Sequence, residues 1–239
     1  MQETVDSGWI NEEILKQLAA LREDNTAIRN ELKSINEKLS QLEKKPVAGG
    51  GRPSSPETID FDSKRALGDK KAQVAIIEYT DYQCPFCTRH AKNVFPQIKE
   101  NLIETGKARY QVADYPLSFH TEAKQAAVAA LCAGRHGVEQ YWVMHNALFE
   151  YSQELGETLY VQQAEALGID RKAFSTCLND PESGKAVDRS IAYGNKIGVS
   201  GTPKFFIGRI EGDAITEIAT ISGAQSYGVF EATVSELLN

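Results

Sequence analysis

The segment Cys84-Pro85-Phe86-Cys87 constrains the fold of this chain more than any other feature. It follows an apolar run, Val74–Tyr79, that is typical of a buried strand, and it opens a predicted helix. Unpaired N–H groups and the helix dipole stabilise a thiolate at such a helix start, where a proline is also tolerated. Since both cysteines lie within one helical turn, they can form and reopen a disulfide. The pattern predicts Cys84 as an exposed nucleophile and Cys87 as a buried resolving thiol.

A single C-x-x-C motif has two other interpretations, half of a zinc site and a structural loop. A zinc site of this type needs a second C-x-x-C motif or paired histidines, and the sequence contains neither. His90 follows Cys87 by three residues but has no partner at ligand spacing. We therefore expect no bound metal and no cofactor.

A second segment, Val199–Phe206, places Thr202 and Pro203 just before a predicted strand, more than 100 residues after the redox motif. A proline at this place is typical of a cis-proline loop, whose backbone groups can pair with an extended substrate chain. The alternative is an ordinary trans proline, which is permitted at a strand start. The presence of the C-x-x-C motif favours the cis form.

The two remaining cysteines, Cys132 and Cys177, bring the total to an even count of four. This count suits one redox pair and one structural disulfide, which needs an oxidising compartment. The bridge would stabilise the fold by roughly 4 kcal/mol in the chain-entropy model. The alternative is a pair of buried free thiols, which a cytosolic protein tolerates.

The first segment, residues 1–45, repeats every seven residues. The a positions are Leu18, Asn25, Leu32 and Leu39, and the d positions are Ile14, Leu21, Ile28, Ile35 and Leu42. About four heptads of this regularity predict a coiled coil. The alternative is a single amphipathic helix packed on its own domain, but such a helix usually shows a wider apolar face.

Residues 10–45 are expected to form a parallel homo-oligomer, because flanking charges then attract each other between helices. The attractive pairs are Asp24 with Arg29, and Lys38 with Glu43. The polar a residue Asn25 favours two strands, whereas Leu at a with Ile at d favours higher order. We expect a dimer rather than a trimer.

Residues 46–60 are predicted to be a flexible linker, because Pro46–Pro56 is rich in glycine, proline and serine. Residues 61–239 show the patterns of an α/β domain with an all-helical insertion at about 119–193. The predicted elements are a strand at 74–79, a helix to about 104, a strand at 108–113, helices at 120–133, 138–151, 159–167 and 171–178, a hairpin of strands 204–207 and 215–221 across 208–213, and a helix at 227–238.

The charge of −7 argues against nucleic acid or an anionic membrane as the main partner, since both need a basic face. No run approaches the roughly 18 apolar residues of a membrane span. Met1–Gly8 is polar and no apolar signal-peptide region follows. This pattern indicates either a cytosolic protein or a mature form that carries a replacement Met1.

Residues 61–239 resemble the DsbA-like branch of the thioredoxin superfamily. The matching stretches are Leu67–Asp69, Ile77–Cys87, Pro116–His120, Gln140–His145 and Gly201–Pro203. The resemblance implies a thioredoxin fold with a helical insertion. It also implies that Cys84 is the nucleophile, Cys87 the resolving cysteine and Pro203 the cis-proline, with Pro85, Phe86 and Thr202 next to the substrate.

Glu78, six residues before Cys84, matches the family's buried acidic residue beneath the active site. Burial would raise its pKa and make it a proton relay for Cys87. The alternative is a surface residue on an edge strand. Lys204 departs from the small or hydroxyl residue expected after the cis-proline, which leaves the charge of the substrate groove open.

Thr202 before the cis-proline resembles the isomerases of the superfamily, whereas the monomeric oxidase has valine there. The heptads resemble the oligomeric architecture of those isomerases and of the suppressor-of-copper-sensitivity proteins. The resemblance therefore implies a periplasmic, oligomeric disulfide isomerase with oxidase activity, acting on misoxidised secreted proteins and recycled by a membrane redox partner. The alternatives are a simple dithiol oxidase and a chaperone or copper-binding oligomer.

Overall fold

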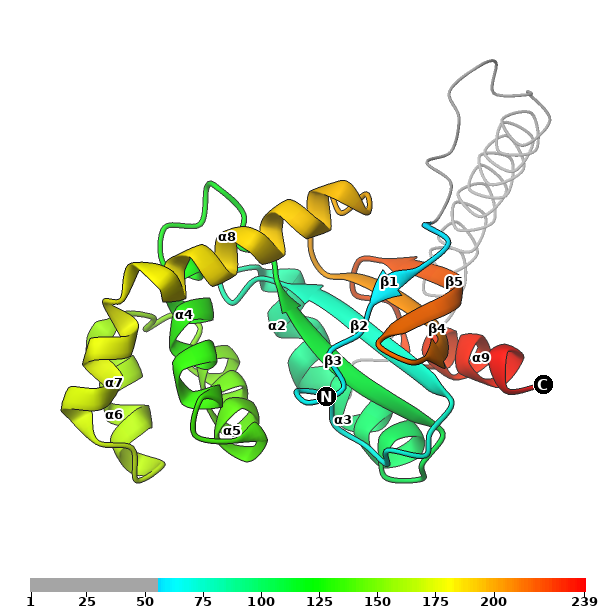
Figure 1. The fold of residues 1–239 in the computed structure, drawn as a ribbon, viewed down its shortest axis with the longest axis horizontal. Coiled ribbons are helices and arrows are strands. Elements are labelled where there is room, and N and C mark those ends of the chain that lie inside the picture. The colour runs from blue at the N-terminus through cyan, green and yellow to red at the C-terminus, as the bar shows by residue number, and fades with distance from the viewer. Residues whose placement is uncertain (1–55) are drawn as a thin grey trace, which may run out of the picture. The chain divides into compact units, whose positions relative to one another are not determined.

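A five-stranded mixed sheet of order β1-β5-β4-β2-β3 forms the centre of the domain (Figure 1). The computed structural model describes residues 56–239, so the predicted coiled coil lies outside the described residues. The strands are β1 (Ile59–Asp60), β2 (Val74–Thr80), β3 (Ala108–Asp114), β4 (Lys204–Glu211) and β5 (Ala214–Ser222). β2 pairs in parallel with β3 and antiparallel with β4. The sheet and its helices confirm the predicted α/β fold with a helical insertion.

β2 is an interior strand, and all seven of its residues are buried. Its apolar and β-branched side chains suit a strand that is covered on both faces. The edge strand β1 was not predicted, because Ile59 and Asp60 fall in the segment expected to be linker. A strand of two residues leaves no periodic pattern in a sequence, and here it is set by its antiparallel pairing with β5.

The helical segment after the redox motif ends close to the predicted residue but is broken into three parts. It consists of α2 (Pro85–Asn93), α3 (Phe95–Ile98) and a π-helical segment, Lys99–Ile103. Pro96 has no N–H to donate to the carbonyl four residues before it, so a regular helix cannot continue through this point.

The predicted all-helical insertion is present. Its helices are α4 (Ala123–Gly134), α5 (Val138–Glu150), α6 (Glu157–Ala166), α7 (Arg171–Leu178) and α8 (Pro181–Lys196). The sequence did not predict α8 as a separate helix. Its start is marked by Asp180, whose carboxylate accepts the Glu182 N–H at 3.0 Å, and by a proline in the first turn. Figure 1 shows α8 running from α7 back to the sheet.

The hairpin is tighter than predicted, because β4 continues to Glu211 and leaves only Gly212 and Asp213 in the turn. Gly212 has a φ of 62°, a conformation that glycine adopts without steric cost. The final helix, α9 (Tyr227–Leu238), packs on β4, with the rings of Phe230 and Phe205 4.8 Å apart. This contact holds Phe205 near the start of β4, two residues after Pro203, against α9.

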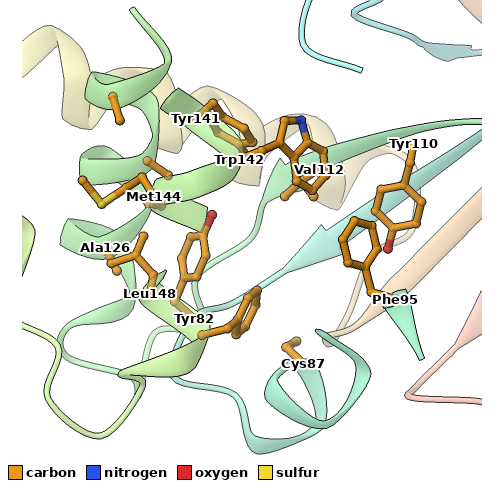
Figure 2. Close-up of a cluster of buried hydrophobic side chains, with 14 of the residues drawn as sticks. Tyr82, Cys87, Phe95, Tyr110, Val112, Ala126, Tyr141, Trp142, Met144 and Leu148 are labelled. Atoms are coloured by element: carbon orange, nitrogen blue, oxygen red, sulfur yellow. The ribbon is translucent and has the colours of Figure 1, made fainter. Parts of the chain in front are cut away.

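Two apolar layers cover the sheet. On one face, Trp142 of the insertion stacks on Phe95 with ring centroids 5.5 Å apart and also contacts Tyr110 of β3. Figure 2 shows this cluster, with Cys87 at its border. On the other face, side chains of β2 and β4 pack against the segment after α8. The redox motif thus begins where the sheet, α2 and the insertion meet.

Candidate active site

Cys84 and Cys87 are both free thiols at the start of α2. Cys84 is the N-cap residue, and its carbonyl accepts the Thr88 N–H at 3.0 Å. The expectation that Cys84 is exposed is wrong, since only 3% of its surface is accessible, against 0% for Cys87. The physical reason is the Thr202 loop, whose carbonyl oxygen lies 3.5 Å from the Cys84 sulfur and accepts a hydrogen bond from it when Cys84 is protonated.

The peptide bond between Thr202 and Pro203 is cis, the isomer expected from the sequence. Pro203 is buried, and the Thr202 hydroxyl is also buried without a hydrogen-bond partner among the described residues. Lys204 does not point its charge at the sulfurs: its ammonium donates to the Ser222 hydroxyl on β5 at 2.8 Å. The loop therefore presents an uncharged backbone edge to Cys84.

The two thiols have opposite acidities. A hydrogen bond from the Cys87 thiol lowers the pKa of Cys84 to about 5. Burial raises the pKa of Cys87 far above its ordinary value, and the neighbouring Cys84 and Glu78 act in the same direction. At neutral pH Cys84 is a thiolate and Cys87 a thiol, so the first attack belongs to Cys84.

Glu78 lies on the interior strand β2 with 2% of its surface exposed, so the edge-strand alternative is wrong. Burial raises its pKa to about 7, and a hydrogen bond from the Tyr110 hydroxyl to Oε2, 2.6 Å long, opposes that rise. Its other oxygen, Oε1, has no partner among the described residues. Glu78 can therefore gain or lose a proton near neutral pH.

The expected substrate-contacting residues Pro85 and Phe86 are exposed at the start of α2. Phe86 leaves 52% of its surface accessible, and the Arg89 guanidinium lies 5.1 Å from its ring centroid. An exposed aromatic ring beside a buried sulfur offers an apolar contact to an approaching chain.

The sequence did not single out Asp81 and His120 as a pair. The Asp81 carboxylate accepts the N–H groups of Gln83 and Cys84 through Oδ1, at 2.7 and 3.1 Å. Its Oδ2 accepts the Leu117 N–H and lies 2.7 Å from His120 Nδ1. Asp81 thus ties the cysteine turn to the segment that leads into the insertion. The only sequence signal was the inclusion of both residues in the family-like stretches.

Cys132 and Cys177 form a disulfide between α4 and α7, with their Cα atoms 5.8 Å apart. It lies within the insertion, and both cysteines are buried. No group of three or more His, Cys, Asp or Glu side chains within residues 56–239 is arranged to hold a metal ion. In the same range, no helix has the length and apolar character needed to cross a bilayer.

Comparison with known proteins places this site in a family. The family model described as Thioredoxin matches residues 61–224. The "Putative protein-disulfide oxidoreductase" of Rickettsia felis is 25% identical over 88% of this chain and 77% of its own length. The crystal structure of Wolbachia pipientis alpha-DsbA1 is 27% identical, with a TM-score of 0.66, and the match covers 75% of this chain and 92% of that one.

A Na(+)/H(+) antiporter, NhaA 3 of Salinispora tropica, is 31% identical over 62% of this chain. The chain spans only 22% of the length of that antiporter. The family model, by contrast, covers strands β2 to β5, the cysteine pair and the Thr202-Pro203 loop. The chain belongs to the thioredoxin family and has the fold of its DsbA-like branch.

Proposed function

We propose that this protein is a thiol–disulfide oxidoreductase that exchanges disulfides with protein substrates through Cys84. The observation that carries the proposal is the contact between the low-pKa sulfur of Cys84 and the loop beside cis-Pro203. A substrate segment that pairs with the edge of that loop would bring its own sulfur to Cys84. The names of the DsbA-like and protein-disulfide oxidoreductase relatives support the same chemistry.

In the reductive half of the exchange, the Cys84 thiolate attacks a substrate disulfide. An S–S bond forms between Cys84 and the substrate, and the other substrate sulfur leaves as a thiolate. Cys87 then gives its proton to Glu78 and attacks the Cys84 sulfur. The second substrate sulfur leaves with its electron pair, so the substrate is reduced and the Cys84–Cys87 pair is oxidised. Oxidation of a substrate dithiol follows the same steps in reverse.

We propose more specifically that the protein is an oligomeric disulfide isomerase. It is supported by the heptads of residues 10–45 and by Thr202 before the cis-proline. Linking several active sites raises the local thiol concentration around one misoxidised chain. We propose a dimer built on residues 1–45, a linker at 46–60, and a membrane redox partner that restores the active site. The Cys132–Cys177 disulfide supports an oxidising compartment such as the periplasm.

The test is reactivation of scrambled ribonuclease by the full-length chain and by a chain without residues 1–45. We expect reactivation by the full chain, none with Cys84→Ala, and a large loss on truncation, with light scattering showing the change in mass. Equal reactivation by Cys84→Ala would refute thiol–disulfide exchange at this site. Unchanged reactivation after truncation would refute the oligomeric isomerase while leaving the exchange chemistry intact.

A simple dithiol oxidase is the second candidate, and the low pKa of Cys84 favours it. A stabilised thiolate stabilises the reduced protein, which makes the disulfide form a stronger oxidant. The oxidase predicts rapid oxidation of reduced ribonuclease by the disulfide form, equal with or without residues 1–45. Copper measured on the reduced protein, with and without Cys84, tests the third possibility of a Cu(I)-binding oligomer.

A further inference from the structure

A buried chain of three polar side chains runs from the active site into the core. It links Glu78 on β2, Tyr110 on β3 and His90 on α2. The Tyr110 hydroxyl lies 2.6 Å from Glu78 Oε2 and 3.0 Å from His90 Nε2. Their exposed fractions are 2% for Glu78 and 0% for the other two, so water does not compete for these bonds. Figure 2 shows Tyr110 beside Phe95 and on the same side of the cluster as Cys87.

The direction of the hydrogen bonds follows from counting protons. Tyr110 has one hydroxyl proton, which it donates to the Glu78 carboxylate. Its oxygen can then only accept, so His90 carries its proton on Nε2. Burial lowers the pKa of His90 to about 3, and the ring is neutral at pH 7. While Glu78 is ionised, His90 therefore donates to Tyr110, and Tyr110 donates to Glu78.

This arrangement favours the ionised form of Glu78 without placing a positive charge beside it. The Tyr110 hydrogen bond opposes the burial that raises the pKa of Glu78. A bond donated by His90 to the tyrosine oxygen polarises the hydroxyl and strengthens its bond to the carboxylate. Meanwhile Glu78 Oε1 has no hydrogen-bond partner among the described residues, and Glu78 lies near enough to Cys87 to raise the pKa of its thiol.

We propose that Tyr110 and His90 are positioning residues that set the pH at which Glu78 can accept the proton of Cys87. The inference rests on the proposed thiol–disulfide exchange and extends it. With the Tyr110 bond, Glu78 is ionised in a large fraction of molecules at neutral pH. Without it, the ionised fraction of Glu78 at neutral pH would fall up to about tenfold, and Cys87 would less often find an acceptor when it attacks the Cys84 mixed disulfide.

One other group on the same face of the sheet titrates near neutral pH: burial raises the pKa of Asp114 on β3 to about 6, and the Arg65 guanidinium opposes that rise. The remaining groups around Glu78 do not change charge there. Burial raises the pKa values of Tyr110, Tyr82 and Tyr141 above their ordinary value, so these residues stay neutral. Burial lowers the pKa of His145 to about 3. β4 and α9 contribute only aromatic rings, those of Phe205 and Phe230, next to His90. Glu78 and Asp114 are thus the groups whose titration the kinetics would report between about pH 5.5 and about pH 9, and only the Glu78 midpoint should respond to Tyr110→Phe.

The experiment uses the reduced full-length protein and an aromatic disulfide that releases a coloured thiolate. The first release reports the attack by Cys84, and the second reports the attack by Cys87 on the mixed disulfide. The rates are measured from about pH 5.5 to about pH 9 for wild type, Tyr110→Phe, His90→Phe and Glu78→Gln. Tyr160→Phe is the matched control, because Tyr160 is also buried but its hydroxyl has no partner among the described residues.

We expect Tyr110→Phe to move the midpoint of the second phase upward by about one pH unit, equivalent to about 1.4 kcal/mol, and to slow it up to about tenfold below the midpoint. His90→Phe should shift the midpoint in the same direction but less. The first phase and the Tyr160→Phe control should match wild type, and Glu78→Gln should remove the midpoint.

Two outcomes separate the inference from the function on which it rests. If Glu78→Gln slows the second phase but neither Tyr110→Phe nor His90→Phe moves its midpoint, the positioning role is refuted and the Glu78 relay stands. If Glu78→Gln leaves the second phase unchanged, the relay itself is refuted. Loss of the first phase in Tyr110→Phe would show damage to the fold and would also contradict the proposal, which predicts an intact Cys84.

Discussion

Replacing Glu78 by Gln should stabilise the folded protein at high pH and not at low pH. Burial raises the pKa of Glu78 from 4.5 to about 7. Below pH 4.5 the carboxyl is neutral in both the folded and the unfolded chain, so its ionisation costs nothing. As the pH rises from 4.5 to 7, the unfolded chain ionises this carboxyl while burial keeps it protonated in the folded protein, so stability is lost; above pH 7 both states are ionised and no more is lost.

The size of the effect follows from the pKa difference. A rise from 4.5 to about 7 corresponds to about 3 kcal/mol of unfolding free energy that wild type loses between these pH values. Glutamine does not ionise and escapes this loss. Its amide can accept the Tyr110 hydrogen bond, but its NH₂ group would be buried without a partner, at a cost of about 1–3 kcal/mol. That cost is independent of pH. The informative quantity is therefore how the difference in unfolding free energy between wild type and Glu78→Gln changes with pH.

Urea unfolding of both proteins from about pH 4 to about pH 8 measures this change. The comparison is best made with Cys84 and Cys87 replaced by alanine, so that no thiol of the site titrates. The difference in free energy should move by about 3 kcal/mol in favour of Gln across that range. Glu100→Gln, at an exposed position, should show no such change. A pH-independent difference at Glu78 would refute the argument that burial controls its acidity.

Two further substitutions test the insertion and the loop. Joint replacement of Cys132 and Cys177 by Ala opens a loop of 45 residues and should lower the unfolding free energy by about 4 kcal/mol, measured by urea unfolding, without changing the rate of Cys84 attack. Thr202→Val removes a buried hydroxyl that has no hydrogen-bond partner among the described residues and that can donate to the Cys84 thiolate. The pKa of Cys84, followed by thiolate absorbance, should rise by about half to one unit, and no rise would show that the hydroxyl does not reach the sulfur.

The sequence predicted the elements that have a strong local pattern. The buried strand β2, the helix start at Pro85 and the terminal helix α9 each follow from apolar periodicity or from cap and breaker residues. It did not predict β1, because two residues pair only when β5 is in place beside them. The break after α2 was also missed, although Pro96 was a visible signal.

At the site, the sequence identified residues whose chemistry is unusual at their positions, such as the cysteine pair and Pro203. It misjudged the exposure of Cys84, because the Thr202 loop that covers the sulfur comes from a segment more than 100 residues away. It gave His90 no role, because its partner Tyr110 belongs to a neighbouring strand. Contacts between distant segments depend on strand register, which single-residue patterns do not encode.

The burial of Cys87, which the sequence predicted, gives the site its direction. An exposed Cys84 and Cys87 would have similar acidities, and either could attack first. In the structure, Cys87 is buried within the core, and its thiol donates a hydrogen bond to the Cys84 sulfur. This bond lowers the pKa of Cys84, and together with burial it raises the pKa of Cys87. The same burial prevents Cys87 from reaching water when it must lose its proton. A buried acceptor with a pKa near neutral pH, Glu78, is therefore a requirement of this geometry rather than an addition to it.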